Sequence, residues 1–479
     1  MEVLKVDVAI IGAGTAGLNA QREAASAGAS WVLIESGPYG TMCARVGCMP
    51  SKLLIAAADA AQEVREAERF GIEVAEDGWK INGAAVMARV RSERDRFAGF
   101  AADATEALPE QNRLRGRAHF VGTTTLEVGD HTRVEAKSVV VATGSSPRVP
   151  DELDAVREEV MVNDDVFELT ELPDSVAVVG TGAMGLELGQ ALHRLGVRVA
   201  LFNPRSSLGP LTDPALRAAA RQTFDQELTL HLETELLGAE RSGDGFSLRY
   251  RDPKGAEHEE RFGCILAATG RRPNLSGLGL ETAGCQLDPN GLPSWDPTTT
   301  QCGDLPIFIA GDVSKHRAVL HEAADEGRIA GANAARWPEV AASVRRTRLM
   351  IAFTDPQMAL VGERFADLSS SEIEVGAASY DNQGRARVMG KNRGLVHVYG
   401  SRTSCRLLGA EMFGPRVEHT SHLLAWAVQQ GLTINHILEM PVYHPVIEEG
   451  IRAALRDLAK KLKVSTWCPP ADRSEGPGA

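Results

Sequence analysis

The chain has 479 residues, of which 43% are hydrophobic and 24% are charged, a composition typical of folded globular proteins. A formal net charge of −13 disfavours nucleic acid or an anionic membrane as the main partner. No apolar run reaches the roughly 18 residues that a membrane helix needs, and the N-terminus carries no signal-peptide pattern. Seven cysteines, an odd number, argue against a secreted disulfide scaffold. We therefore expect a cytoplasmic protein without nucleic-acid or membrane partners, in which any disulfide takes part in chemistry.

The first 35 residues predict one β-α-β unit. An apolar strand runs into a glycine-rich turn and a helix, and a second strand, residues 31–34, ends on Glu35. In a G-x-G-x-x-G turn, the first glycine makes the tight bend, the second admits a pyrophosphate, and the third allows close packing of helix and strand. An acid after the second strand binds a ribose hydroxyl. The glycines of this turn are Gly12, Gly14 and Gly17.

The same pattern begins again at residue 175, so the sequence predicts two nucleotide-binding units in tandem. The second turn contains Gly180, Gly182 and Gly185. At the position equivalent to Glu35 the second unit has Asn203, followed two residues later by Arg205. Asparagine does not repel a 2′-phosphate, and Arg205 could pair with one or simply lie in solvent. The choice between NAD and NADP at this unit therefore stays open.

Cys43 and Cys48 follow the first unit, separated by four residues that include Gly47. This spacing is poor for zinc because no second Cys/His pair is nearby. In a regular helix the two positions lie about 140° apart around the axis with a rise of about 7.5 Å, whereas a disulfide needs Cα atoms about 4.4–6.8 Å apart. A disulfide here requires a distorted helix or Cys43 in the preceding turn, and a strained bond is easily reduced. The alternative is two unrelated buried cysteines.

A histidine and a glutamate near the C-terminus form a second candidate pair. Glu449 lies five residues after His444 and could orient its imidazole and stabilise the charged form. His419 and His422 have no further ligand nearby, so no metal site is expected. The remaining cysteines have no spacing partner and are interpreted as structural: Cys264, Cys285, Cys302, Cys405 and Cys468.

From residue 6 to about 462, the order of these motifs resembles the class I pyridine nucleotide–disulfide oxidoreductases, most closely their dihydrolipoamide dehydrogenase branch. The resemblance implies an α/β fold with two tandem Rossmann-like dinucleotide-binding domains and a C-terminal α+β interface domain, in an obligate homodimer. The predicted parts are an FAD-binding domain with the dithiol (1–149), an NAD(P)-binding domain (150–273), a central segment returning to the FAD domain (274–345), an interface domain (346–468) and a disordered tail (469–479).

The resemblance also implies roles for individual residues. Lys52, paired with Glu187, would lie beside the flavin, where a cation stabilises negative charge on the reduced ring. His444 would act as general base with Glu449 as its partner, both supplied to the dithiol by the neighbouring subunit. The implied FAD contacts are Gly12, Gly14, Gly17, Glu35, Lys52, Ala118, Thr143, Gly144, Ser145, Asp312, Ala318 and His321. The implied nicotinamide-site residues are Gly180, Gly182, Gly185, Glu187, Asn203, Arg205 and Gly270.

The activity implied is oxidation of dihydrolipoamide, or of a dihydrolipoyl protein domain, through the Cys43–Cys48 disulfide and FAD, with hydride transfer to NAD. Substrate would attack Cys43, and Cys48 would lie nearer the flavin. Alternatives are an NADPH-dependent reductase of another small disulfide such as glutathione, and a flavin redox sensor without turnover. A soluble transhydrogenase shares the Asn-x-Arg pattern but needs neither dithiol nor dyad. Mercuric reductases carry a C-terminal cysteine pair, whereas Cys468 stands alone.

Overall fold

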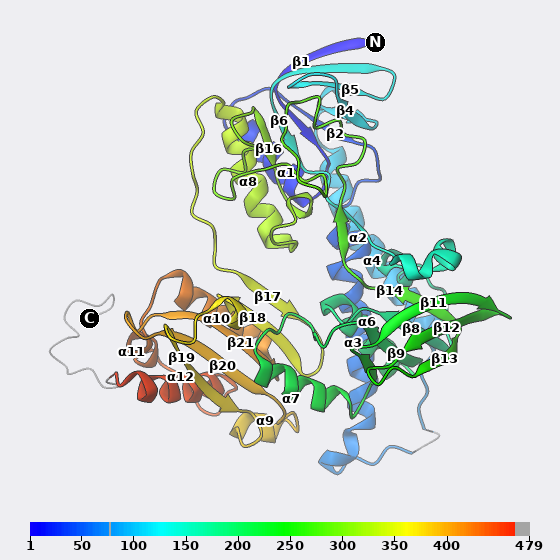
Figure 1. The fold of residues 1–479 in the computed structure, drawn as a ribbon, viewed down its shortest axis with the longest axis vertical. Coiled ribbons are helices and arrows are strands. Elements are labelled where there is room, and N and C mark those ends of the chain that lie inside the picture. Colours follow the sequence, from blue (N-terminus) through cyan, green and yellow to red (C-terminus); the bar gives the residue numbers. More distant parts are fainter. Residues whose placement is uncertain (76–77, 465–479) are drawn as a thin grey trace.

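The first of the sheets combines strands from the N-terminus with one strand from beyond residue 300. The computed structural model describes residues 1–75 and 78–464, and this sheet forms the upper part of Figure 1. Its order is β3-β2-β1-β6-β5-β4, and β16 pairs with β6. Its strands are β1 (Glu2–Ile11), β2 (Trp31–Glu35), β3 (Arg113–Arg115), β4 (Ala118–Phe120), β5 (Thr125–Val128), β6 (Thr132–Val141) and β16 (Ile307–Ile309).

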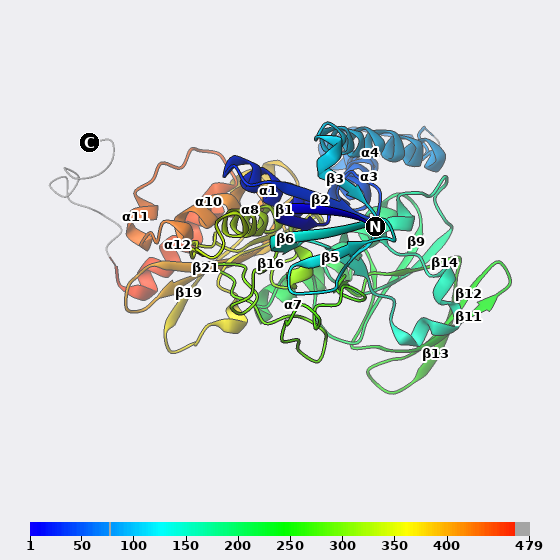
Figure 2. The same cartoon turned by 90° about the horizontal axis from the view of Figure 1, so that it is seen from above.

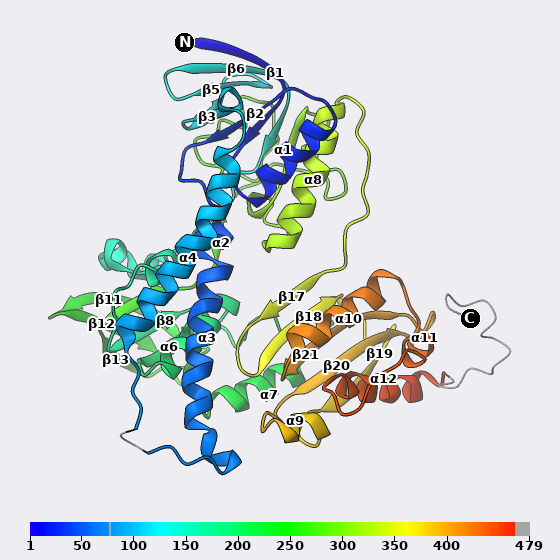
Figure 3. The same ribbon diagram turned by 180° about the vertical axis from the view of Figure 1, so that it is seen from behind.

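Both faces of this sheet are covered, and the alternation of side chains along β1 shows how. Val8 and Ile10 pack toward α1 (Thr15–Ser26) and α8 (Leu320–Arg336), whereas Ala9 and Ile11 pack toward the segment 278–305. The two helices lie side by side in Figure 3. Their contact depends on glycine, because a Cβ on Gly327 would lie 2.2 Å from the carbonyl oxygen of Ala16. The backbones of α1 and α8 therefore touch directly.

Three helices leave the first sheet between β2 and β3. They are α2 (Met42–Val46), α3 (Cys48–Arg65) and α4 (Gly83–Glu106). Figures 2 and 3 show α3 and α4 side by side, running from the first sheet past the second. Because α3 also packs on α6 (Ala183–Arg194), its side chains reach the second nucleotide-binding unit.

The second parallel sheet has the order β10-β9-β8-β14 and is joined by a three-stranded antiparallel sheet, β11-β12-β13. Two short strands, β7 and β15, pair antiparallel with each other where the chain passes from the first unit to the second and back. These elements are α5 (Asn163–Val166), α7 (Pro214–Phe224), β7 (Ser145–Pro147), β8 (Ser175–Val179), β9 (Arg198–Asn203), β10 (Thr229–Leu232), β11 (Glu235–Ser242), β12 (Gly245–Arg251), β13 (Glu257–Phe262), β14 (Cys264–Ala267) and β15 (Arg271–Pro273).

The C-terminal part is an antiparallel sheet of order β17-β18-β21-β20-β19, packed against helices. Its elements are β17 (Leu349–Ala352), β18 (Gln357–Gly362), β19 (Ile373–Ser379), α9 (Gly384–Val388), β20 (Leu395–Ser401), β21 (Leu407–Gly414), α10 (Val417–Gln429), α11 (Ile434–Leu438) and α12 (Glu448–Leu462). Among the described residues, no helix is long and apolar enough to cross a membrane. Cys468 and the predicted tail, 469–479, lie outside the described residues.

The contact between α1 and α8 gives a stability prediction. Gly327→Ala forces the two helices apart and is expected to lower the free energy of unfolding by about 1–3 kcal/mol, the usual effect of overpacking. Gly99→Ala on α4 is the matched control, because a Cβ there meets no atom within 4 Å. Denaturant unfolding should show the control unchanged or up to about 1 kcal/mol more stable. Equal stability of both variants would contradict the close contact.

Candidate active site

The two candidate redox cysteines lie on either side of a break between two helices. The short helix α2 ends at Val46, and α3 begins at Cys48, with Gly47 between them at φ −126° and ψ −116°. A Cβ on Gly47 would lie 3.1 Å from the carbonyl oxygen of Met42, so the bend favours glycine. Cys43 and Cys48 are free thiols, and their side chains are hydrogen-bonded to each other. The helix is thus interrupted where the spacing predicted a distortion.

The hydrogen bond shifts the pKa values of the two thiols in opposite directions. It lowers the pKa of Cys48 to about 7, helped by the charge of Lys52 and opposed by burial. The same hydrogen bond, together with burial, raises the pKa of Cys43 above the usual thiol range. In the reduced pair, Cys48 is therefore the thiolate and Cys43 keeps the proton.

An ion pair beside the dithiol joins three parts of the fold. Lys52 Nζ on α3 lies 2.7 Å from Oε2 of Glu187 on α6, and the Glu187 side chain is only 4% exposed. The other carboxylate oxygen, Oε1, accepts a 2.9 Å hydrogen bond from the backbone N–H of Phe353, between β17 and β18. Lys52 Nζ also lies 4.4 Å from the centre of the Phe353 ring. Phe353 has no sequence signal for this position, because a single apolar residue in a loop is uninformative.

These groups border a cavity of about 1950 Å³ that runs from the dithiol along the end of the first sheet. Most residues that the family resemblance assigned to FAD line it: Gly12, Gly14, Glu35, Lys52, Ala118, Thr143, Gly144, Ser145, Asp312 and Ala318. Cys43, Cys48 and Glu187 line it as well. Gly17 and His321 do not. Gly17 instead packs against the turn, since a Cβ there would lie 1.8 Å from the carbonyl oxygen of Gly12. Leu320 and Ala323, on either side of the His321 position, line the cavity while the His321 side chain is directed elsewhere.

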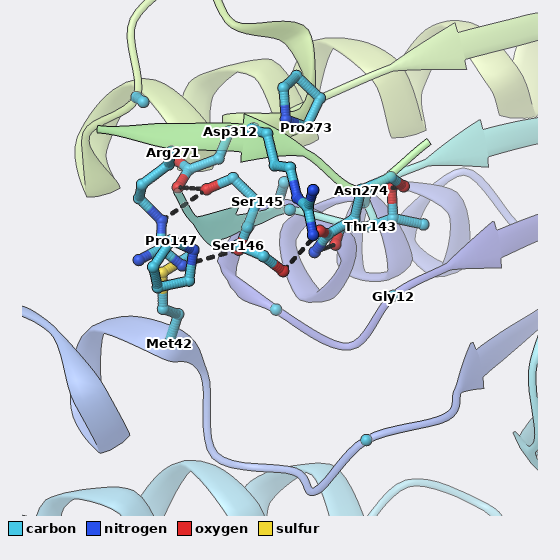
Figure 4. A pocket seen from close by; sticks show the side chains of 18 of the residues that line it. Gly12, Met42, Thr143, Ser145, Ser146, Pro147, Arg271, Pro273, Asn274 and Asp312 are labelled. Carbon is cyan, nitrogen blue, oxygen red and sulfur yellow. Dashed lines mark hydrogen bonds between the residues drawn. The ribbon is translucent and has the colours of Figure 1, made fainter. Parts of the chain in front are cut away.

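Residues of the paired strands β7 and β15 line one wall of the cavity, and Figure 4 shows several of their side chains. Ser145 Oγ donates to Asp312 Oδ2 at 3.0 Å and accepts a 2.8 Å hydrogen bond from Arg271 Nε. Ser146 Oγ donates to Asn274 Oδ1 at 2.7 Å. Arg271 and Asn274 were not among the predicted site residues, because their partners lie more than a hundred residues away.

The glycine turn at the start of α1 fits a dinucleotide pyrophosphate. Gly12 has φ +109° and lies against the carbonyl of Ala142, whereas a Cβ on Gly14 would meet no atom within 4 Å. No side chain caps the N-terminus of α1, so its first backbone N–H groups are available to a phosphate. Glu35 accepts hydrogen bonds from the N–H groups of Ala13 and Gly37 and so holds the turn in place.

The second glycine turn repeats this geometry. Gly180 has φ +114° and lies against the carbonyl of Ala268; Gly182 faces open space; and a Cβ on Gly185 would lie 2.0 Å from the carbonyl oxygen of Gly180. Again no side chain caps the following helix, α6. Gly270, which follows β14, has φ +100°. The glycines of this turn do not line the large cavity, but Ala183, Met184 and Glu187 of α6 do.

Asn203 at the end of β9 is 8% exposed and is bonded within its own loop. Its amide nitrogen donates to Thr181 Oγ1 and to Ser207, and its Oδ1 accepts the N–H of Arg205 at 3.0 Å. Arg205 itself is exposed. The Arg217 Nη2 atom donates to Ser206 Oγ at 3.0 Å, so a second guanidinium lies beside the same loop.

The His444–Glu449 pair is formed but lies elsewhere. His444 Nδ1 is 3.0 Å from Glu449 Oε1, and Val446 N–H donates to Oε2 at 3.3 Å. The hydrogen bond to His444 lowers the pKa of Glu449, so that carboxylate stays ionised. The His444 side chain is 79% exposed and does not line the cavity that contains Cys43 and Cys48. Within one chain, the dyad and the dithiol do not meet.

Two of the cysteines interpreted as isolated are in contact. The thiols of Cys285 and Cys302 are hydrogen-bonded to each other within one apolar cluster, although neither has a spacing partner in the sequence. Spacing along the chain says nothing of contacts made by folding. Over residues 1–75 and 78–464, no group of three or more possible metal-ligating side chains occurs.

Comparison with known proteins identifies the family. Residues 6–327 match the model of the pyridine nucleotide-disulphide oxidoreductases, and residues 350–455 match the dimerisation domain of the same family. The chain belongs to this family, which confirms the predicted fold class and makes it an oxidoreductase that acts on sulfur groups. Membership implies FAD and a nicotinamide dinucleotide as cofactors, and the dimerisation domain points to a homodimer.

The similar proteins differ in substrate. The chain is 30% identical to a dihydrolipoyl dehydrogenase of Thermus scotoductus (95% of this chain, 98% of the relative). It is 32% identical to a mercuric reductase of Streptomyces lividans (96% and 98%). Among solved structures, LpdA of Mycobacterium tuberculosis aligns with a TM-score of 0.80 at 26% identity (94% and 99%). The flavoprotein disulfide reductase RclA of Escherichia coli, at 21% identity and TM-score 0.80, shares the fold (96% and 99%).

The thiol hydrogen bond predicts a measurable pKa change. Cys43→Ala removes the donor and should raise the pKa of Cys48 from about 7 toward the ordinary thiol value of 9.0. Cys43→Ser keeps a donor and should leave it near 7. The rate of Cys48 alkylation by iodoacetamide in the reduced protein, measured against pH, reports the thiolate fraction, which falls as the pH drops below the pKa. Identical pH profiles for the two variants would show that Cys43 does not control Cys48.

Proposed function

We propose that this protein oxidises dihydrolipoamide, or a dihydrolipoyl protein domain, at a Cys43–Cys48 disulfide and passes the electron pair through FAD to NAD. The observation that carries the proposal is that the thiol pair lies in the same cavity as the Lys52–Glu187 ion pair and the glycine turn of the first unit. The similar dihydrolipoyl dehydrogenases match over nearly the whole chain, which supports this substrate class.

In the proposed reaction, His444 of a second copy accepts a proton from one thiol of the substrate. The hydrogen bond between Nδ1 and Glu449 orients the ring, leaves Nε2 to take the proton, and places a carboxylate where positive charge develops. The substrate thiolate attacks Cys43 Sγ, and Cys48 leaves as the thiolate. The second substrate thiol then attacks the mixed disulfide, which releases cyclic disulfide product and the reduced Cys43.

Cys48 is suited to be the leaving sulfur and the electron donor. Its lowered pKa makes it the better leaving group, and Lys52 lies one helical turn further along α3. FAD, when bound, supplies the two-electron exchange between this dithiol and the nicotinamide. Lys52, held by Glu187 and Phe353, places a cation beside the space that the flavin would fill.

A homodimer would bring the dyad to the dithiol. In the C-terminal part, which also carries His444, large apolar side chains are exposed: Leu423 (45%), Trp426 (65%), Met440 (46%) and Tyr443 (81%). Exposed apolar groups of this size typically mark an interface. A second copy covering them would explain both their exposure and the separation of the dyad from the dithiol.

A second candidate function is an NADPH-dependent reductase of another small disulfide, such as glutathione disulfide. The observation in its favour is the loop after β9, where Asn203 is engaged internally, Arg205 is exposed, and Arg217 donates to Ser206. Two guanidinium groups at this loop would suit an adenosine 2′-phosphate. The similar mercuric reductase suggests mercuric ion as a further substrate.

The substrate is tested by initial rates of the FAD-loaded dimer with four pairs. We expect the highest kcat/KM for dihydrolipoamide with NAD, above dihydrolipoamide with NADP, glutathione disulfide with NADPH, and mercuric ion with NADPH. Cys48→Ser should abolish turnover, and Cys405→Ser, a lone thiol on the C-terminal part, should retain it. Turnover only with glutathione disulfide would replace the proposal by the second candidate. Stoichiometric oxidation without turnover would indicate a redox sensor.

The cofactor loop is tested separately. Because hydrogen bonds to charged groups contribute about 1.5–3 kcal/mol, Arg205→Ala should lower kcat/KM for NADP(H) about tenfold or more. The value for NAD(H) should stay within about twofold, because that cofactor has no 2′-phosphate. Arg221→Ala is the control, since this arginine pairs with Asp225 and Glu233. An equal loss with both cofactors would show that Arg205 does not read the phosphate.

A further inference from the structure

A second pair of thiols lies outside the site described above and has no part in the proposed reaction. Cys285 and Cys302 are 8% and 2% exposed and hydrogen-bonded to each other. They belong to the apolar cluster that covers the face of the first sheet opposite α1 and α8. Each sulfur atom has the other as its hydrogen-bond partner, and in the described part of the chain the carboxylate of Glu281 is the one charge that acts on the Cys285 thiol.

Each cysteine belongs to a segment that leads to the large cavity. The N–H of Cys285 donates to the carbonyl of Leu280 at 3.0 Å, and Leu280 lines the cavity. The N–H of Cys302 donates to the carbonyl of Ile307 at 2.8 Å, at the start of β16, the strand that leads to Asp312. A bond between the two sulfur atoms would therefore tie two segments of the cavity wall together.

The pair has the asymmetry that dithiol oxidation needs. The hydrogen bond from Cys302 lowers the pKa of Cys285 against burial and the charge of Glu281, whereas the same bond and burial raise the pKa of Cys302. Cys285 is therefore the more readily ionised thiol of the two and the one assigned as nucleophile. Both residues lie just beneath the surface, because the neighbours of Cys285 on each side and Gly303 and Asp304 after Cys302 are exposed. A small oxidant has only one layer of residues to pass.

We propose that Cys285 and Cys302 form a second redox-active pair, which hydrogen peroxide closes to a disulfide independently of Cys43 and Cys48. The Cys285 thiolate attacks one peroxide oxygen, the O–O bond breaks, hydroxide leaves, and Cys285 becomes a sulfenic acid. The Cys302 sulfur then attacks the Cys285 sulfur, and the hydroxyl group leaves with the Cys302 proton as water. Two electrons pass from the dithiol to peroxide, and the new S–S bond joins the two segments of the cavity wall.

The sequence makes the test direct, because no Lys or Arg lies between residues 273 and 314 and trypsin therefore releases both cysteines on one peptide. The FAD-loaded protein is treated with hydrogen peroxide, denatured, alkylated with iodoacetamide and digested. We expect this peptide to lack two hydrogens and both alkyl groups, and to gain two alkyl groups when dithiothreitol precedes alkylation. After cleavage before Asp288 and Asp296, the piece that contains Cys285 should stay joined to the piece that contains Cys302 until the disulfide is reduced.

Two controls isolate the pair. Cys264 and Cys405, which have no thiol partner in the described residues, should remain alkylated after the same treatment. The Cys43→Ser/Cys48→Ser double variant should form the Cys285–Cys302 bond to the same extent, which excludes exchange with the catalytic pair. Full alkylation of the tryptic peptide after peroxide, or oxygen added at Cys285 without a bond to Cys302, would overturn the proposal. The readout uses the native cysteines, so it does not depend on a substituted pair folding.

Discussion

The buried carboxylate of Glu187 is the group on which the arrangement of the cavity depends. An ionised side chain that is 4% exposed must be paired and hydrogen-bonded, and its two oxygens are served by different parts of the chain. Lys52 comes from α3, beside the first sheet, and the N–H of Phe353 comes from the C-terminal sheet. Because Glu187 itself belongs to the second unit, the ion pair is satisfied only when all three parts are in contact.

One cysteine of the dithiol, Cys48, lies on the same helix as Lys52, α3. Cys48 is the first residue of α3, where the helix dipole favours a thiolate, and Lys52 follows four residues later on the same face. The break at Gly47 brings Cys43 into hydrogen-bond contact with that thiolate. A regular helix would hold the two sulfur atoms apart, so the interruption brings the two thiols together beside the Lys52–Glu187 ion pair.

Local patterns predicted much of this architecture. Both glycine turns are followed by the expected helices, α1 and α6. Other elements are less plain in the sequence. The apolar run of β6 covers only its second half, because the strand begins at Thr132 with alternating polar residues paired with β5. Helix α3 ends at Arg65, and the chain continues as a 3₁₀ turn, Ala67–Phe70.

Contacts between distant segments could not be read from spacing. Phe353, Arg271 and the Cys285–Cys302 pair are ordinary residues until folding places them beside Lys52, Ser145 and each other. The direction of the His321 side chain could not be read from the sequence for a related reason, since a motif match places the backbone but not the ring.

In the proposed mechanism one active site requires two chains, because His444 is exposed and does not line the cavity that contains Cys43 in its own chain. The most direct measurement co-expresses the Cys48→Ser and His444→Ala variants, each inactive alone, and assays the purified mixed dimers. One intact site of the two in each mixed dimer predicts recovery to roughly half of the wild-type activity, or roughly a quarter in the unfractionated mixture formed by random pairing. No recovery in mixed dimers that are shown to form and bind FAD would contradict a dithiol served by the second copy's dyad.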